Sequence, residues 1–411
     1  MKTYIILHNN IDGMGGGQMY VCNKAKYMEK LGWAVVIFSS TDGQVMIPEL
    51  NKHRQYITPD LIASPLVYSK KYSSKVIDHM LSFIIHREHC VIESGSARMV
   101  FWGELLAQKL HCKHMAHLLY ERPDHAIPEH YLPYYWFKWN RRELSGIDIH
   151  SLRLLFRNDS RVTQDKCYNL PSVCHNVASE QDGADIVIPE ADHVLVCLGR
   201  LEKPYVSAAS KAFVHVAANH PEKQFSVVYI GDASSTIHKE NIGRQFEGLK
   251  NVSLVMPGYV YPIPGNVLRK GHVYISSSGS AAVTYEQGIV TIAIDLIDNK
   301  AIGVLGYTTQ NRSYRKDEPQ QDPAELLEKV LFSDYLSHYV YTPIQSDSVD
   351  GLLQQHVDFL EQSEKKLDFF DLHSLKISGR DRIKRCCSLF FGSKGFLRMR
   401  RLIIKLRHST K

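Results

Sequence analysis

The feature that most constrains the fold is a rhythm of short apolar runs and amphipathic helices that occurs twice along the chain. Near the N-terminus, the apolar run 4–7 is followed by a loop (8–17), by apolar residues at helical spacing, and by a second run (33–38). The rhythm starts again at residue 193, after the polar stretch 178–192. Uninterrupted apolar strands separated by amphipathic helices indicate parallel sheets covered on both faces. The sequence therefore predicts an α/β fold with two Rossmann-like, doubly wound domains facing a cleft.

The second half of the chain alternates most regularly. Its pattern predicts strands at 193–198, 225–230, 252–256, 273–275 and 291–295, and helices at 207–219 and 281–287. At 411 residues the chain is too long for one hydrophobic core. We predict an N-terminal Rossmann-like domain (1–180), a C-terminal Rossmann-like domain (190–350), and a closing helix with a basic amphipathic tail (351–411).

Charge is distributed unevenly along the chain. The formal net charge is +6, but from residue 376 onward twelve basic residues face a single acid, Asp381. The basic residues are Lys376, Arg380, Arg382, Lys384, Arg385, Lys394, Arg398, Arg400, Arg401, Lys405, Arg407 and Lys411. The body before them is mildly acidic, with 37 basic and 42 acidic residues. We therefore expect no nucleic-acid partner, because such a surface needs cations spread across it.

The cysteines and the apolar segments favour a reduced, cytoplasmic protein. Eight cysteines are scattered without a CxxC pair. Cys167, Cys174 and His175 lie close together, but no second ligand pair follows at zinc spacing, so no metal is expected. The apolar start is too short for a signal peptide, and no run of about eighteen uncharged apolar residues occurs, so no membrane span is predicted.

The glycine-rich loop before the first predicted helix is one candidate anion site. It contains Gly15, Gly16 and Gly17 and can bring backbone amides and a helix N-terminus to a phosphate. Its spacing does not match the dinucleotide fingerprint GxGxxG. A plain tight turn is the alternative.

A second group of polar residues follows two predicted strands of the C-terminal half. Arg200 and Lys203 come just after strand 193–198, and the serine-rich stretch 276–280 comes after strand 273–275. Open α/β sheets bind ligands at the carboxyl ends of their strands, where two cations can hold a diphosphate. Glu286 lies in the following helix and could accept hydrogen bonds from a ribose diol. The alternative is a surface arginine–glutamate pair beside a serine-rich loop.

These strings resemble a known family. VCLGRLEK, VVYIGD, NVSLVMPGYV and VYISSSGSAAVTYEQGIVTIAID, in this order, look like the donor half of the retaining, nucleotide-sugar-dependent glycosyltransferases of family four, which have the GT-B fold. The N-terminal GMGGGQMYVCNKAKYMEKLGWAVVIFSS is similar to their opening. The resemblance is good over residues 1–40 and 190–300 and thin between 45 and 175.

The resemblance implies roles for individual residues. Gly16 and Gly17 would approach the donor phosphates, Arg200 and Lys203 would bind the diphosphate, and Glu286 would hold the ribose. The backbone near the sugar hydroxyls would come from Ser278, Gly279, Ser280 and Ala281. Two features depart from the family. Ser278 stands where the first of two glutamates is usual, and Arg200 and Lys203 are closer together in sequence than usual.

The resemblance also implies that residues 1–180 form the acceptor-side domain and residues 190–350 the nucleotide-sugar donor domain. Two further regions lie in the implied acceptor-side domain. His117, in a predicted strand at 114–119, is the candidate for a family histidine near the sugar, with an ordinary packed histidine as the alternative. His125, His130 and the aromatic run 131–139 could form an acceptor surface, but apolar and aromatic residues favour a place in the core.

The basic tail has an amphipathic pattern. Phe396, Met399, Ile403 and Leu406 fall on one helical face, and basic residues lie off it. Such a segment is expected to lie on an anionic membrane surface. A closing helix packed on the N-terminal domain is the alternative.

The resemblance implies a retaining hexosyltransferase that moves a sugar from a nucleotide-diphosphate sugar to a hydroxyl of a saccharide. We expect the acceptor to be lipid-linked, the role to be surface polysaccharide synthesis, and the place to be the cytoplasmic face of the inner membrane. The nucleotide sugar is a co-substrate, and no cofactor is expected. An epimerase-type GT-B enzyme and a non-catalytic nucleotide-sugar-binding relative are the alternatives.

Overall fold

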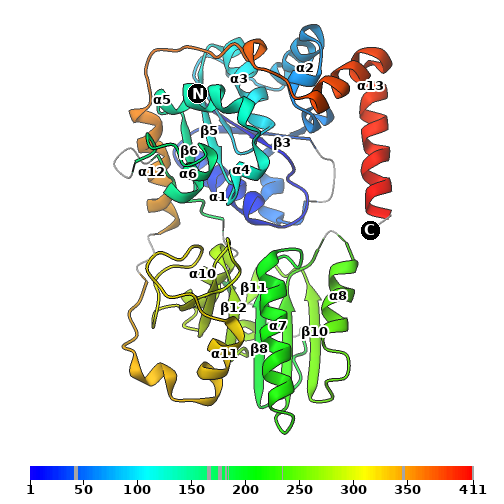
Figure 1. The fold of residues 1–411 in the computed structure, drawn as a ribbon. Helices are drawn as coiled ribbons and strands as arrows, with labels where there is room; N and C mark the ends of the chain where they lie inside the picture. Colours follow the sequence, from blue (N-terminus) through cyan, green and yellow to red (C-terminus); the bar gives the residue numbers. More distant parts are fainter. Residues whose placement is uncertain are drawn as a thin grey trace. The chain divides into compact units, whose positions relative to one another are not determined.

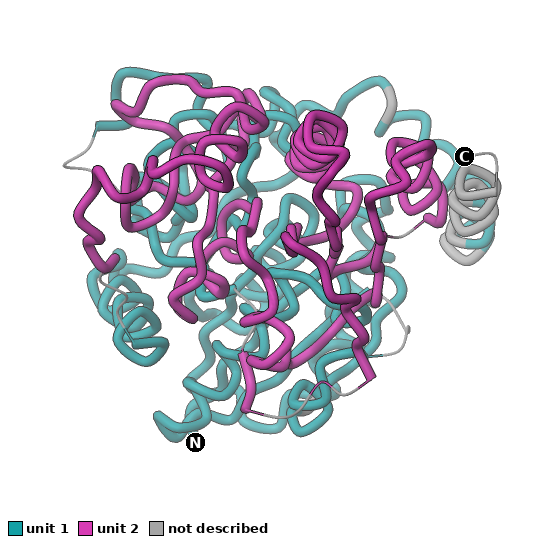
Figure 2. Tube along the Cα trace, turned by 90° about the horizontal axis from the view of Figure 1, so that it is seen from below, with its two compact units in different colours: residues 1–174, 347–410 teal, residues 175–346, 411 magenta. Residues whose placement is uncertain are grey.

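The computed structural model divides the chain into two compact units. It describes residues 1–40, 45–163, 168–174, 178–180, 183, 185–233, 235–344 and 348–409. Unit 1 is Met1–Cys174 together with Asp347–Thr410, and unit 2 is centred on His175–Ser346. Figure 2 colours unit 1 teal and unit 2 magenta. The C-terminal segment is therefore part of the same unit as the N-terminus.

Unit 1 contains a six-stranded parallel sheet in the order β3-β2-β1-β4-β5-β6. The order is that of a Rossmann sheet. The strands are β1 (Thr3–His8), β2 (Ala34–Ser39), β3 (Arg54–Ile57), β4 (Cys90–Ser94), β5 (Lys113–Leu118) and β6 (Leu144–Gly146). The helices are α1 (Gly16–Lys30), α2 (Lys70–Ser82), α3 (Met99–Leu110), α4 (Pro123–Ala126), α5 (Leu132–Asn140) and α6 (Ile149–Leu155), with α12 (Val349–Gln362) and α13 (Gly379–Ser409) from the C-terminal segment (Figure 1).

Apolar strands occur in this sheet because both of its faces are covered. Every residue of β1 is buried, because helices cover both sides. Ile5 and Leu7 belong to the core formed with α2 and α3, whereas Tyr4 points to the other face, toward α1. The aromatic run predicted to be core is core, since Tyr134, Tyr135 and Trp139 are buried.

Unit 2 repeats the arrangement with one change. Its main sheet has the order β10-β9-β8-β12-β13-β14, and β14 runs antiparallel to β13. The strands are β7 (Ala178–Ser179), β8 (His193–Leu198), β9 (Phe225–Ile230), β10 (Val252–Gly258), β11 (Ile263–Pro264), β12 (Val273–Ser276), β13 (Thr291–Ile294) and β14 (Ala301–Val304). The helices are α7 (Pro204–Asn219), α8 (Ile237–Gln245), α9 (Gly265–Leu268), α10 (Ser278–Glu286) and α11 (Pro323–Phe332). The two Rossmann-like sheets predicted from the sequence are thus confirmed.

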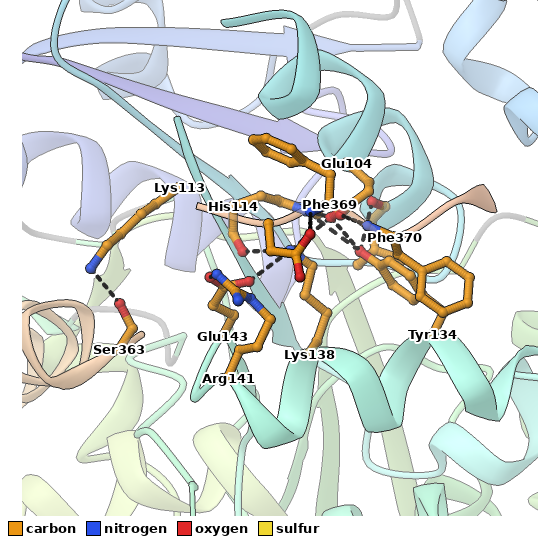
Figure 3. Close-up of polar contacts among 12 residues, drawn as sticks. Glu104, Lys113, His114, Tyr134, Lys138, Arg141, Glu143, Ser363, Phe369 and Phe370 are labelled. Atoms are coloured by element: carbon orange, nitrogen blue, oxygen red, sulfur yellow. Dashed lines mark hydrogen bonds and ion pairs between the residues drawn. The ribbon is translucent and has the colours of Figure 1, made fainter. Parts of the chain in front are cut away.

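The C-terminal segment returns to unit 1 and is held there by a buried polar cluster. We define the clamp cluster as Glu104, His114, Lys138 and Glu143 (Figure 3). Lys138 Nζ lies 2.7 Å from Glu104 Oε2 and 2.9 Å from Glu143 Oε2, and all these side chains are nearly inaccessible. The other oxygen of Glu104 accepts a hydrogen bond of 2.8 Å from the backbone amide of Phe370. The clamp cluster therefore ties the returning chain to α3 and α5.

Burial and neighbouring charges shift the pKa values of Glu104 and His114 in the clamp cluster. Burial alone would raise the pKa of Glu104, but Lys138 and His114 lower that pKa to about 2. Burial and the Lys138 charge lower the pKa of His114. The carboxylate of Glu104 is thus held in its ionised form, beside an imidazole whose pKa lies below its ordinary value.

The C-terminal segment also differs from its predicted course. The sequence predicts helix over 352–375, but α12 ends at Gln362, and residues 364–371 have no helical structure. The backbone is instead held by contacts to unit 1, such as the 2.9 Å bond from Glu364 N to Arg141 O. Among the described helices, none is both long enough and apolar enough to cross a membrane.

Candidate functional site

The carboxyl edge of the unit 2 sheet is built on glycines that allow a very close backbone approach. Gly199 follows β8 with φ +146°, and a Cβ there would lie 1.8 Å from Tyr205 Oη. Gly231 follows β9 with φ +148°, and its Cβ would lie 2.0 Å from the carbonyl oxygen of Gly199. Only glycine has these dihedral angles without strain. The loops after β8 and β9 are therefore packed backbone to backbone.

Arg200 and Lys203 lie in the loop that this packing fixes. The Leu201 amide donates to Asp232 O at 3.0 Å, and the Lys203 amide donates to Arg200 O at 3.0 Å. The Arg200 side chain is about half exposed, and its Nη1 lies 3.2 Å from Glu202 Oε1. Lys203 is the residue just before α7. Both cations thus stand at the carboxyl edge, on a rigid loop.

The serine-rich stretch after β12 lies beside this loop. Ser276 Oγ donates to Leu198 O at 2.7 Å, which joins the ends of β12 and β8. A Cβ at Gly199 would come within 3.6 Å of Ser280 Oγ, so the first turn of α10 is next to the Arg200 loop. In that turn, the amides of Gly279 and Ser280 have no intrahelical carbonyl to bond. The structure therefore brings two cations and a helix N-terminus to one edge.

Ser278 has an unusual backbone conformation. Its φ is +54°, a left-handed value that costs a non-glycine residue about 1 kcal/mol or more. Its amide donates to Arg312 O at 2.7 Å, and its hydroxyl lies 3.0 Å from Ser313 Oγ. The loop at Arg312 and Ser313 thus holds the start of α10 in place. Such strain is concentrated at functional sites.

Glu286 lies apart from the other unit 2 candidates. It is the exposed last residue of α10, eight residues after Ser278. At 1.5 Å of rise per residue, the two are about 12 Å apart along the helix axis. Only an extended ligand would contact both. The ribose role of Glu286 stays a prediction.

The glycine-rich stretch of unit 1 is tightly packed. Gly15 precedes α1, but Gly16 and Gly17, predicted to lie in the loop, are the first two residues of the helix. A Cβ at Gly16 would lie 3.3 Å from Cys174 Sγ, and one at Gly17 would lie 2.9 Å from His8 Nε2. His8, the last residue of β1, places Nδ1 2.8 Å from Asn10 O, so Nδ1 carries the proton. Both glycines therefore have a packing role, and their approach to phosphates stays a prediction.

His117 lies on β5, in a buried polar cluster beneath α1. Its Nδ1 lies 2.8 Å from Ser145 Oγ, and its ring is between those of Tyr20 and His356, with centroids 5.1 and 5.0 Å away. The side chain is 2% exposed, and burial lowers its pKa to about 4. Within the described chain, its Nε2 has no hydrogen-bond partner. In this structure His117 is a neutral core histidine, and contact with a sugar stays a prediction.

Two residues at these edges were missed by sequence reasoning. His8 could have been found by the rule that identified Arg200, because it lies at the carboxyl end of a predicted strand. Arg312 could not, because it lies 34 residues beyond Ser278, in a stretch without periodic structure. Within the described ranges, no group of three or more histidine, cysteine, aspartate or glutamate residues is placed to hold a metal ion. Cys167 and His175 lie outside those ranges.

Comparison with solved structures identifies the fold. No protein-family model matches the chain, and no curated protein matches it in sequence. HepE from Anabaena, solved in complex with UDP and glucose, is 12% identical with a TM-score of 0.61, over 88% of this chain and all of that one. A glycosyltransferase from Rickettsia africae is 13% identical with a TM-score of 0.57, over 88% and 99%.

A third structure is similar over the same share of the chain. A variant of TarM from S. aureus, in complex with fondaparinux, α-GlcNAc-glycerol and UDP, is 10% identical with a TM-score of 0.56, over 88% of this chain and all of that one. Identities this low show the fold alone. Together with the two Rossmann-like sheets, these likenesses show that the chain has the GT-B fold of glycosyltransferases.

Proposed function

We propose that this protein is a glycosyltransferase that moves a sugar from a nucleotide-diphosphate sugar to a hydroxyl of a saccharide. The observation that carries the proposal is the edge of unit 2, where the loop that contains Arg200 and Lys203 lies beside the first turn of α10. Two cations and helix N-terminal amides suit a departing diphosphate, whose negative charge grows as the sugar leaves. HepE and TarM were solved with UDP, so UDP is the first nucleotide to test.

The proposed chemistry retains the configuration at the anomeric carbon. The bond from that carbon to the phosphate oxygen breaks, and its electron pair goes to the diphosphate. The acceptor oxygen bonds to the same face of the sugar, and its proton moves to the leaving phosphate oxygen. Arg200, Lys203 and the α10 amides would stabilise the diphosphate during this step. The anomeric configuration of the product, measured by NMR, tests retention, and an inverted product would contradict it.

The proposed acceptor is a saccharide carried on a lipid, in surface polysaccharide synthesis. The basic C-terminal segment supports this part, because cations next to apolar side chains favour an anionic membrane surface. The proposal therefore includes association of the protein with the cytoplasmic face of a membrane.

Substitution of the two cations tests the diphosphate site. Arg200→Ala and Lys203→Ala should each weaken UDP binding about tenfold or more, because a charge-assisted hydrogen bond contributes about 1.5–3 kcal/mol. Transfer should fall about 100-fold if these groups act mainly in the transition state. Binding is measured by calorimetry, and transfer by mass spectrometry of the product. Arg244→Ala, on the exposed side of α8, is the matched control.

The outcomes separate the alternatives. If both variants transfer sugar at the wild-type rate, the diphosphate assignment is wrong. A changed sugar nucleotide formed without any acceptor would indicate an epimerase. Tight UDP binding without turnover on a broad acceptor panel would indicate a non-catalytic relative.

A further inference from the structure

Helix α13 bends sharply at Gly392. This residue has φ +66° and ψ +162°, which are not helical values. After the bend, Phe396 is 5% exposed and meets the ring of Tyr68 edge to face, with centroids 6.1 Å apart. Met399 also packs against this core. The residues just after the bend therefore pack against unit 1.

This packing corrects the predicted membrane face of the tail. The sequence predicts that Phe396, Met399, Ile403 and Leu406 together face a membrane. Phe396 and Met399 instead pack on unit 1, as in the alternative of a closing helix. The side chains of Ile403 and Leu406 lie outside the described residues. The described part of the predicted face, Phe396 and Met399, is therefore occupied by unit 1.

The first half of α13 presents other apolar residues to solvent. We define the bend surface as Ile383, Cys386, Leu389, Phe390 and Phe391, all exposed. Phe390 is 86% exposed and Phe391 58%. Cys386 comes three residues after Ile383, and Phe390 comes four residues after Cys386. These three side chains therefore share one helical face. Four large apolar side chains in nine residues form a patch of the kind that marks an interaction site.

Other residues of the same half-helix contact unit 1. Tyr131 donates to Asp381 Oδ2 at 3.0 Å, and Ser388 is buried. Cys387 packs against the unit 1 core. These contacts hold the helix to unit 1 through residues outside the bend surface.

Charge identifies the surface that the bend surface fits. Lys376, Arg382 and Arg398 of the same C-terminal segment are exposed, and the only acid from residue 376 onward, Asp381, is paired with Lys384. Aromatic side chains flanked by cations suit the headgroup region of an anionic bilayer. A second copy of the chain would bring a like-charged segment against this one, which is repulsive.

We propose that the bend surface inserts into the interface of a membrane containing anionic phospholipids. The inference rests on the membrane part of the proposed function and names the residues that make the contact. Gly392 is central to it, because the bend places Phe390 and Phe391 at a vertex while Phe396 anchors the helix behind them.

Vesicle sedimentation with the full-length protein tests the surface. The wild type should bind vesicles of phosphatidylcholine with about 30% phosphatidylglycerol, bind neutral vesicles weakly, and dissociate as salt is raised. The double variant Phe390→Ser/Phe391→Ser should bind anionic vesicles about tenfold or more weakly. Its melting temperature should match the wild type, since both side chains are exposed. Ile85→Ser, at a 66% exposed site of unit 1, is the matched control.

A fluorescence measurement reports insertion directly. The added emission of Phe390→Trp should shift to the blue with anionic vesicles, and that of Ile85→Trp should not. Unchanged binding by the double serine variant would overturn the proposal. A wild-type dimer that the same variant converts to a monomer, without vesicle binding, would assign the surface to a second copy instead.

The same variants separate this inference from the proposed chemistry. Sugar transfer to a soluble saccharide should be unchanged in Phe390→Ser/Phe391→Ser. If the wild type binds vesicles but transfers no sugar, the membrane role of the bend surface is supported and the proposed function is contradicted.

Discussion

At the scale of single residues, the carboxyl edge of unit 2 depends on backbone atoms that leave no room for a side chain. The carbonyl of Gly199 occupies the position that a Cβ of Gly231 would take. Tyr205 closes the other side, since its hydroxyl donates to Leu198 O at 3.1 Å. The position of Arg200 follows from this packing. A change at either glycine should therefore affect both folding and ligand binding.

We expect Gly231→Ala to lower the stability of unit 2 by more than about 2 kcal/mol, because it adds steric overlap to a φ that alanine rarely adopts. UDP affinity should fall as well, since the Arg200 loop must move. Urea unfolding and calorimetry measure the two effects. Gly243→Ala, in α8, where a Cβ would meet nothing within 4 Å, is the control and should be neutral or slightly stabilising. Equal stability of the two variants would contradict the packing argument.

Residues that follow strands could be found from the sequence, and residues placed by packing could not. Arg200 and Ser280 were linked only by the rule that strand ends share an edge, and the structure puts their loops side by side. The burial of His117 was not predictable, because α1 and α12 cover it from segments more than 200 residues apart. A strand pattern shows that a side chain faces a helix layer, but it does not show how completely that layer covers it.

At the scale of elements, the clamp cluster explains how an irregular stretch stays in place. Residues 364–371 have no helical hydrogen bonds, so their polar groups need partners elsewhere. Glu104 on α3 and Arg141 after α5 supply them, with Phe370 N and Glu364 N as donors. A buried charge cluster is costly to form but still more costly to break.

Lys138→Met should destabilise unit 1 by about 3–5 kcal/mol, because it leaves the carboxylates of Glu104 and Glu143 buried without their shared cation. Protease cleavage within 364–378 should become faster as the returning chain loosens. Thermal unfolding and limited proteolysis are the measurements. Lys109→Met, at an exposed pair with Asp78, should cost less than about 1 kcal/mol. A similar loss in both variants would show that the cluster contributes no more than a surface pair.

Strands were more predictable than the C-terminal helices. β8 and β9 have the predicted bounds, because a buried parallel strand is apolar along its whole length. The tail was predicted as one amphipathic helix, but the bend at Gly392 means that the residues before it and after it present different faces to unit 1. Periodicity gives the apolar face of a helix without saying what covers that face, so the exposed Phe390 and Phe391 could not be separated from the buried Phe396.

At the scale of the whole molecule, unit 1 is discontinuous in sequence. The chain leaves it after Cys174, forms unit 2, and returns at Asp347. Among its described side chains, the returning segment contributes six buried apolar ones to unit 1: Leu353, Phe359, Leu360, Leu372, Leu375 and Phe396. It also contributes His356, whose Nδ1 lies 3.3 Å from the hydroxyl of Tyr20 on α1. Unit 1 should therefore need the end of the chain to fold.

Truncation tests this dependence. Six buried apolar side chains at about 2 kcal/mol each amount to roughly 12 kcal/mol, which is comparable with the whole stability of a typical domain. A chain ending at Ser346 should therefore lose the calorimetric transition of unit 1 and keep that of unit 2. UDP should still raise the temperature of the remaining transition if the donor site lies in unit 2. A chain ending at Arg400 retains Phe396 and Met399 and should keep both transitions. Survival of both transitions in the shorter chain would mean that the N-terminal 174 residues fold alone, and that the returning segment only covers a core that is already stable.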